Sequence, residues 1–203
     1  MSILRQIFGP SKNEIWRQLS DQIGGDFVQS GFFKTSKVEV HHKQWTITLD
    51  AYTESSGESS QTYTRMRAPY VNKDGFRFTI YRKGFFNELG KLLGMQDIEI
   101  GEPAFDDDFI IKGNAETQVQ ELLSNPRIRS LIEQQPKVYL TVRDDEGWFK
   151  TRFPEGVDEL YFRVPGVVKD IDRLKALYDL FAEVLNHMCQ IGSAYEDDPG
   201  IVL

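Results

Sequence analysis

The chain has 203 residues, of which 40% are hydrophobic and 27% charged, a composition typical of a globular protein with a well-buried core. Its formal net charge of -7 argues against a nucleic-acid-binding protein, because phosphates require a basic face. The single cysteine, Cys189, excludes an intrachain disulfide and fits a reducing compartment. No segment approaches the roughly 20 apolar residues that a membrane-spanning helix needs. We therefore expect a cytoplasmic protein without a membrane span.

The first half of the chain is predicted to hold one helix followed by a sheet. Ser11 and Glu14 have the spacing of a capping box, and Gly24 marks the end of the helix that they begin. Beyond it, apolar and polar residues alternate as in strands, and the short turns favour antiparallel pairing. The predicted strand segments are 37–53, 61–70 and 75–83, and a short helix over 84–94 closes this half.

The second half is predicted to mix strands and helices. Asn114 is expected to cap a helix, and Pro126 fits the first position of the next one. The clearest pattern is 170–191, whose wide apolar face suits packing against a sheet, or alternatively against a second copy in a homodimer. The predicted strands of this half are 97–101, 105–113, 137–144 and 159–167.

Together these elements predict an α+β fold with a mainly antiparallel sheet, packed by a long C-terminal helix and shorter helices. With no low-complexity linker and no internal repeat, residues 1–203 are expected to form one compact domain. The alternative is a division into a sheet-rich half, 1–95, and an α/β half, 96–203.

Known catalytic motifs are incomplete in this sequence. The passage that begins at Gly84 resembles a phosphate-binding loop. However, five residues instead of four separate Gly84 from Gly90, and Leu92 stands where the loop requires serine or threonine. His187 and Cys189 are two residues apart on a predicted helix and therefore face away from each other. The sequence thus favours a non-catalytic protein without a cofactor, although catalytic groups can assemble from distant positions.

One face of the predicted first sheet is polar and carries arginines and tyrosines. Arg65 and Arg67 share a face of one strand, and Arg77 and Tyr81 share a face of the next. Guanidinium forks and phenol hydroxyls suit a carboxylate, a phosphate or an acidic protein surface. An antiparallel sheet can also expose a polar face that binds nothing. These four residues are nevertheless the best candidate ligand site in the sequence.

A second candidate is the run of aspartates at 106–108. On an extended strand Asp106 and Asp108 share a face with their Cα atoms roughly 7 Å apart, which suits a hard cation such as calcium or magnesium. The simpler interpretation is that these charges solvate the start of a strand and discourage edge pairing. A catalytic metal site is a third alternative.

The segment "FDDDFIIKGNAETQVQELLSNPRIRSLI" resembles an uncharacterised bacterial domain family. The resemblance covers the second half of the chain and departs from the family at Val119-Gln120, where a small residue and an arginine are typical. It implies a fold and no activity, with the apolar positions anchoring the core and the aspartates facing water. The matching residues are Phe105, Asp106, Phe109, Ile111, Asn114, Leu122, Leu123 and Pro126.

Two functional hypotheses follow from the sequence. The first is a binding or interaction module that uses the polar sheet face to hold a protein partner or a small anionic ligand. The alternative is a divalent-cation-dependent hydrolase, or a cation-responsive protein, that uses Asp106 and Asp108.

Overall fold

The computed structural model describes residues 10–29, 36–57, 59–85, 95–144 and 153–203, and it confirms the α+β class with a mainly antiparallel sheet. Its helices are α2 (Lys12–Ile23), α3 (Pro103–Asp108), α4 (Glu116–Ser124), α5 (Pro126–Glu133) and α6 (Ile171–Gln190). Its strands are β1 (Asp26–Val28), β2 (Lys37–His42), β3 (Trp45–Ser56), β4 (Ser59–Asn72), β5 (Phe78–Arg82), β6 (Gln96–Asp97), β7 (Phe109–Gly113), β8 (Tyr139–Arg143), β9 (Val157–Pro165) and β10 (Ala194–Tyr195).

One sheet unites strands from both halves of the chain. The strand order is β1-β2-β3-β4-β9-β8-β5-β7-β6, with β10 paired to β4 outside this path. Neighbouring strands in this order pair antiparallel. Strands β8 and β9 lie between β4 and β5, which are consecutive in sequence. Pairings between distant segments therefore build the centre of the sheet.

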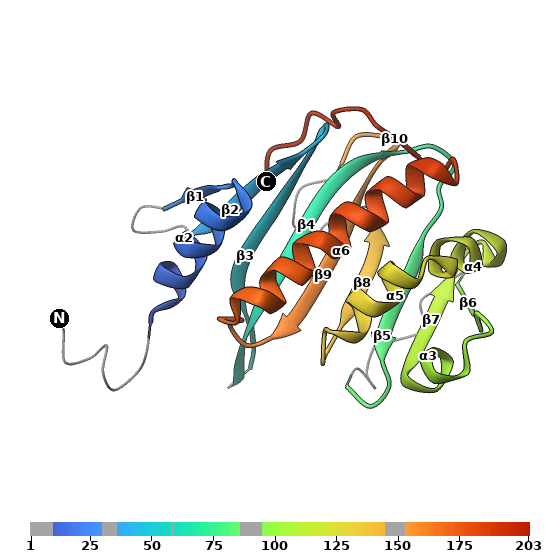
Figure 1. Cartoon of the computed structure of the whole chain (residues 1–203), viewed down its shortest axis with the longest axis horizontal. Helices are drawn as coiled ribbons and strands as arrows, with labels where there is room; N and C mark the ends of the chain where they lie inside the picture. The colour runs from blue at the N-terminus through green and yellow to red at the C-terminus, as the bar shows by residue number, and fades with distance from the viewer. Residues whose placement is uncertain (1–9, 30–35, 58, 86–94, 145–152) are drawn as a thin grey trace.

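Helices α2, α4, α5 and α6 lie on one face of this sheet (Figure 1). The predicted capping box begins α2, because the Ser11 hydroxyl accepts from the Glu14 amide and the Glu14 carboxylate accepts from the Ser11 amide. Gly24 ends this helix at φ 68°, a left-handed conformation that glycine adopts without strain.

The predicted C-terminal helix is confirmed as α6. Its apolar residues Leu174, Leu177, Leu180 and Phe181 are almost fully buried in one hydrophobic core that includes residues of the sheet and of α2, α4 and α5. The apolar face that the sequence offered for a homodimer is thus buried within this chain.

The prediction of a strand over 105–113 was wrong in its first part. Residues Pro103–Asp108 form α3, and the strand β7 begins only at Phe109. Proline at the first helical position favours the helix. The rings of Phe105 and Phe109 stack with centroids 4.4 Å apart, so one helical turn brings both rings into the core.

Two smaller expectations also change. The strand predicted over 97–101 is β6, and it ends at Asp97. The residue before the first turn of α4 is Ala115, while the Asn114 side chain bonds instead to the backbone of residues 75 and 77. Most of the helix predicted over 84–94 lies outside the described residues.

Candidate ligand-binding site

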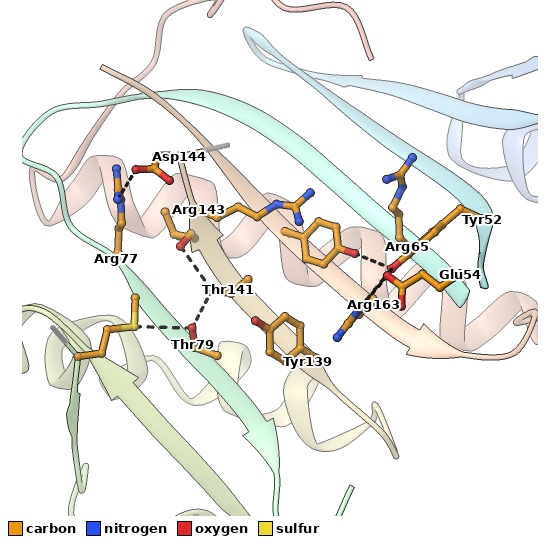
Figure 2. A pocket seen from close by; sticks show the side chains of 13 residues that line it. Tyr52, Glu54, Arg65, Arg77, Thr79, Tyr139, Thr141, Arg143, Asp144 and Arg163 are labelled. Atoms are coloured by element: carbon orange, nitrogen blue, oxygen red, sulfur yellow. Dashed lines mark hydrogen bonds and ion pairs between the residues drawn. The ribbon is translucent and has the colours of Figure 1, made fainter. Parts of the chain in front are cut away.

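The face of the sheet opposite the helices carries a pocket of about 360 Å³ (Figure 2). Strands β3, β4, β5, β8 and β9 contribute most of its lining. Arginines, tyrosines and threonines dominate this lining, so we call the cavity the arginine–tyrosine pocket. It is lined by Tyr52, Glu54, Arg65, Arg77, Thr79, Met95, Tyr139, Thr141, Val142, Arg143, Asp144, Tyr161 and Arg163.

Strand register explains why these side chains meet. Asp50 on β3 pairs with Arg65 on β4, and Arg65 pairs with Arg163 on β9. Two residues before Arg163 on β9, Tyr161 pairs with Thr141 on β8, and Thr141 pairs with Thr79 on β5. Side chains at paired positions lie on the same face of the sheet, so two adjacent rows of polar residues form the pocket floor.

Buried carboxylates hold three of the lining arginines in place. Arg65 donates two hydrogen bonds to Asp50, at 2.7 and 2.8 Å. Arg77 donates two to Asp158, both at 3.2 Å. Arg143 donates to Glu159 at 2.8 Å from Nε, with Nη2 2.7 Å from the same oxygen. The side chains of Asp50, Asp158 and Glu159 are only 9%, 5% and 0% exposed, respectively. Such anchors fix the guanidinium planes before a ligand arrives.

Two further carboxylates at the pocket are exposed. Glu54 accepts from Nη1 of Arg163 at 3.3 Å, and its side chain is 51% exposed. Asp144 accepts from Nη1 of Arg77 at 2.8 Å, and its side chain is 58% exposed. Water competes for both members of an exposed ion pair, so these two contacts are weak compared with the buried ones.

Tyrosine rings form cation–π contacts with the arginines of the pocket. The guanidinium carbon of Arg143 lies 3.6 Å from the centroid of the Tyr161 ring, which is a cation–π contact. Arg65 lies 4.8 Å from the Tyr52 ring, and Arg163 lies 5.3 Å from the Tyr139 ring. The hydroxyls of Tyr52 and Tyr161 share a hydrogen bond of 3.1 Å.

The protonation states of these groups favour anion binding. Burial raises the pKa of Tyr139 and of Tyr161, so both phenols stay neutral and can donate hydrogen bonds. Burial alone would lower the pKa of Arg163, but the Tyr52 hydroxyl and the nearby Tyr161 and Glu54 outweigh it and the pKa is raised. The guanidinium of Arg163 therefore carries its charge at every physiological pH.

Two asparagines fix the position of Arg77. The Asn114 side chain accepts from the amide of Arg77 at 2.9 Å and donates to the carbonyl of Gly75 at 2.7 Å. The Asn72 side chain donates to Asp158 at 2.5 Å, so the carboxylate that holds Arg77 is itself held. These bonds fix both the backbone of Arg77, just before β5, and the carboxylate that its side chain contacts.

The structure separates the four arginine and tyrosine residues predicted from the sequence. Arg65 and Arg77 line the pocket. Arg67 is buried beneath it and donates to Asp50 at 3.0 Å. Tyr81 does not line the pocket but packs against two residues that do, Tyr139 and Tyr161.

The aspartates at 106–108 are engaged in the fold. The Asp106 carboxylate accepts from the backbone amides of Ile100, Gly101 and Glu102, at 3.0, 3.0 and 3.1 Å. Asp108 accepts from Arg82 at 2.6 Å. Because they lie on α3 instead of a strand, the common face expected for them is not formed. Within the described residues, no group of three His, Cys, Asp or Glu side chains is placed to hold a metal ion.

Sequence reasoning missed the contributions of β8 and β9. Both strands were predicted. Their alternation already places Tyr139, Thr141 and Arg143 on one face of β8, and Tyr161 and Arg163 on one face of β9. What the sequence lacked was the pairing of β9 with β4 and of β8 with β5, which joins these faces to Arg65 and Arg77.

No helix of the described part of the chain is long and apolar enough to cross a membrane. A scan against protein-family models and a search of curated protein sequences give no match. A solved structure with a similar fold is the crystal structure of the mycobacterial trehalose monomycolate transport factor A, TtfA, with a TM-score of 0.51 and 9% sequence identity. The match covers 87% of this chain and 95% of that chain. At this identity the likeness concerns the fold alone.

Proposed function

We propose that this chain is a binding module that captures a small anionic ligand in the arginine–tyrosine pocket. One observation carries the proposal. The pocket presents guanidinium groups whose positions are fixed by buried carboxylates, as Asp50 fixes Arg65 and Asp158 fixes Arg77. Preorganised donors bind an anion without a further loss of side-chain entropy.

The ligand chemistry follows from the lining. Planar guanidinium groups match carboxylate and phosphate oxygens, and the neutral hydroxyl of Tyr139 can add a hydrogen bond. The tyrosine rings offer apolar surface to the body of the ligand. A cavity of about 360 Å³ lies within the range of small-molecule sites. We therefore favour a small carboxylate or phosphate compound over an acidic protein partner.

The test compares an anion with a neutral molecule of the same shape. Benzoate and benzamide are titrated separately into the isotopically labelled chain at constant ionic strength, and amide chemical shifts are followed by NMR. We expect benzoate to produce saturable shifts at Thr79, Tyr139 and Thr141, and benzamide to produce none that saturate over the same range. Equal responses to both molecules, or no saturable response to benzoate, would contradict the proposal.

Two variants locate the binding. Arg163→Gln removes a pocket cation and should weaken benzoate binding. Arg127→Gln is the matched control, since Arg127 lies on α5 on the helical face and bonds to Glu183 at 2.9 Å. Equal losses in both variants would show that benzoate responds to overall charge instead of the pocket.

A further inference from the structure

The positive charges at the pocket exceed the negative charges buried beneath it. Five arginines lie at or below the pocket among the described residues, and three buried carboxylates contact all of them except Arg163. Two positive charges are left for groups on the open side of the pocket. The arginines are Arg65, Arg67, Arg77, Arg143 and Arg163, and the buried carboxylates are Asp50, Asp158 and Glu159.

Glu54 and Asp144 supply two negative charges, but they do so from exposed positions. Their side chains are half or more exposed, whereas the three carboxylates beneath the pocket are nearly inaccessible to water. An incoming anion can replace an exposed carboxylate at little cost, because water already competes for that ion pair. Displacing a buried carboxylate would instead leave its charge unpaired inside the protein.

The two exposed ion pairs lie at opposite ends of the pocket. Figure 2 shows Arg77 with Asp144 at one end, and Arg163 with Glu54 at the other, while Thr79, Tyr139 and Thr141 lie between them. The two pairs therefore define two anion positions, and each position pairs one arginine with one exposed carboxylate.

Strand geometry gives the separation of these ends. Leu140 pairs with Phe162, which places Tyr139 beside Arg163, and Tyr139 pairs with Tyr81, four residues beyond Arg77. Two strand spacings and four residues of rise put the Cα atoms of Arg77 and Arg163 about 16 Å apart. The Arg77 guanidinium is held at Asp158 and Asp144, and the Arg163 guanidinium is held at Tyr52 and Glu54, so the two groups stay at opposite ends of the pocket (Figure 2). One compact anion therefore cannot reach both guanidinium groups, but an elongated molecule with an anionic group at each end can.

We propose that the arginine–tyrosine pocket takes an elongated dianion, whose two anionic groups replace the carboxylates of Glu54 and Asp144. This inference rests on the proposed function and specifies its ligand class. Arg163 and Arg77 bind the two anionic ends. The rings of Tyr139 and Tyr161 contact the body of the ligand. The hydroxyls of Thr79 and Thr141 bond to each other at 2.7 Å and form the buried floor under it.

The experiment compares straight-chain dicarboxylates with monocarboxylates of the same length. Succinate, adipate, suberate and sebacate are titrated into the labelled chain by NMR at constant ionic strength, with octanoate as the monoanion matched to suberate. We expect suberate to bind about tenfold more tightly than octanoate, because the second end binds from within the same pocket. We also expect succinate to lack this advantage, since it is too short to reach both arginines.

Variants at the two ends sharpen the test. Arg77→Gln and Arg163→Gln should each reduce the affinity for suberate to that for octanoate. Glu54→Gln and Asp144→Asn should each raise the affinity for suberate by about threefold, because the ligand no longer competes with a resident carboxylate. Both carboxylates are exposed, so these two substitutions leave the fold intact.

The outcomes separate this inference from the proposed function. Tighter binding of suberate, lost in either arginine variant, supports the dianion. Equal binding of suberate and octanoate in the pocket would overturn the dianion and leave anion capture standing. If neither suberate nor octanoate shifts the pocket amides saturably, the inference is wrong, and the proposed function is wrong as well if benzoate also fails to shift them.

Discussion

Arg67 is expected to stabilise the fold instead of contacting a ligand. Its side chain is 6% exposed, donates to Asp50 at 3.0 Å and lies 4.0 Å from Glu159. Arg67→Met keeps most of the side-chain volume but removes the charge that both buried carboxylates face. Asp50 keeps Arg65 and Glu159 keeps Arg143, so each retains one cationic partner.

The magnitude follows from this partial compensation. Removing one member of a buried ion pair costs about 3–5 kcal/mol, and the retained partners place Arg67→Met at the lower end, about 3 kcal/mol. For a chain of 203 residues, each 1 kcal/mol lowers Tm by about 2–4 °C. We therefore expect Tm to fall by about 6–12 °C.

Scanning calorimetry and urea unfolding of the same samples measure this change. Arg127→Met is the control, because the Arg127 side chain is 60% exposed and such a change alters stability by about 0.5 kcal/mol or less. The reasoning about buried charge would be refuted if Arg67→Met lowered Tm no more than Arg127→Met does.

Three further predictions concern the aspartates of α3 and the buried tyrosine Tyr161. Asp106→Ala should lower the free energy of unfolding by about 2 kcal/mol in urea titrations, since three backbone amides lose their acceptor, whereas the exposed neighbour Asp107→Ala should change it little. Calcium, magnesium or manganese added to the EDTA-stripped chain should leave Tm unchanged, because Asp106 and Asp108 already bond within the protein; a specific site occupied at a hundredfold excess would instead add about 2.7 kcal/mol of stability. Burial raises the pKa of Tyr161 above its unfolded value of about 10, so the unfolded chain loses this proton first and stability falls as pH rises beyond that value. Tyr161→Phe should consequently lose less stability than the wild type between about pH 9 and 11, and parallel pH profiles would count against this explanation.

Local signals predicted much of the fold. The capping box at Ser11 and Glu14, proline at the start of α5 and the wide apolar stripe of α6 each depend on residues close in sequence. Period-two alternation likewise predicted a polar sheet face that includes Arg65 and Arg77, and both line the pocket.

The remainder depended on contacts between distant residues. Arg67 occupies a strand position equivalent to that of Arg65, yet it is buried because Asp50 and Glu159 approach it from β3 and β9. The aspartates at 106–108 continue the pattern of a strand, but Pro103 and the stacking of Phe105 on Phe109 favour one helical turn. Local periodicity predicts neither the order of the strands in the sheet nor the contact between the Phe105 and Phe109 rings.

A crystal structure of the chain with bound benzoate would test anion capture most directly. Our account predicts that the carboxylate lies in the arginine–tyrosine pocket, with its oxygens about 2.7–2.9 Å from guanidinium nitrogens of Arg77 or Arg163. Benzoate bound only on the helical face, for example at Arg127, with an empty pocket at saturating concentration, would contradict it.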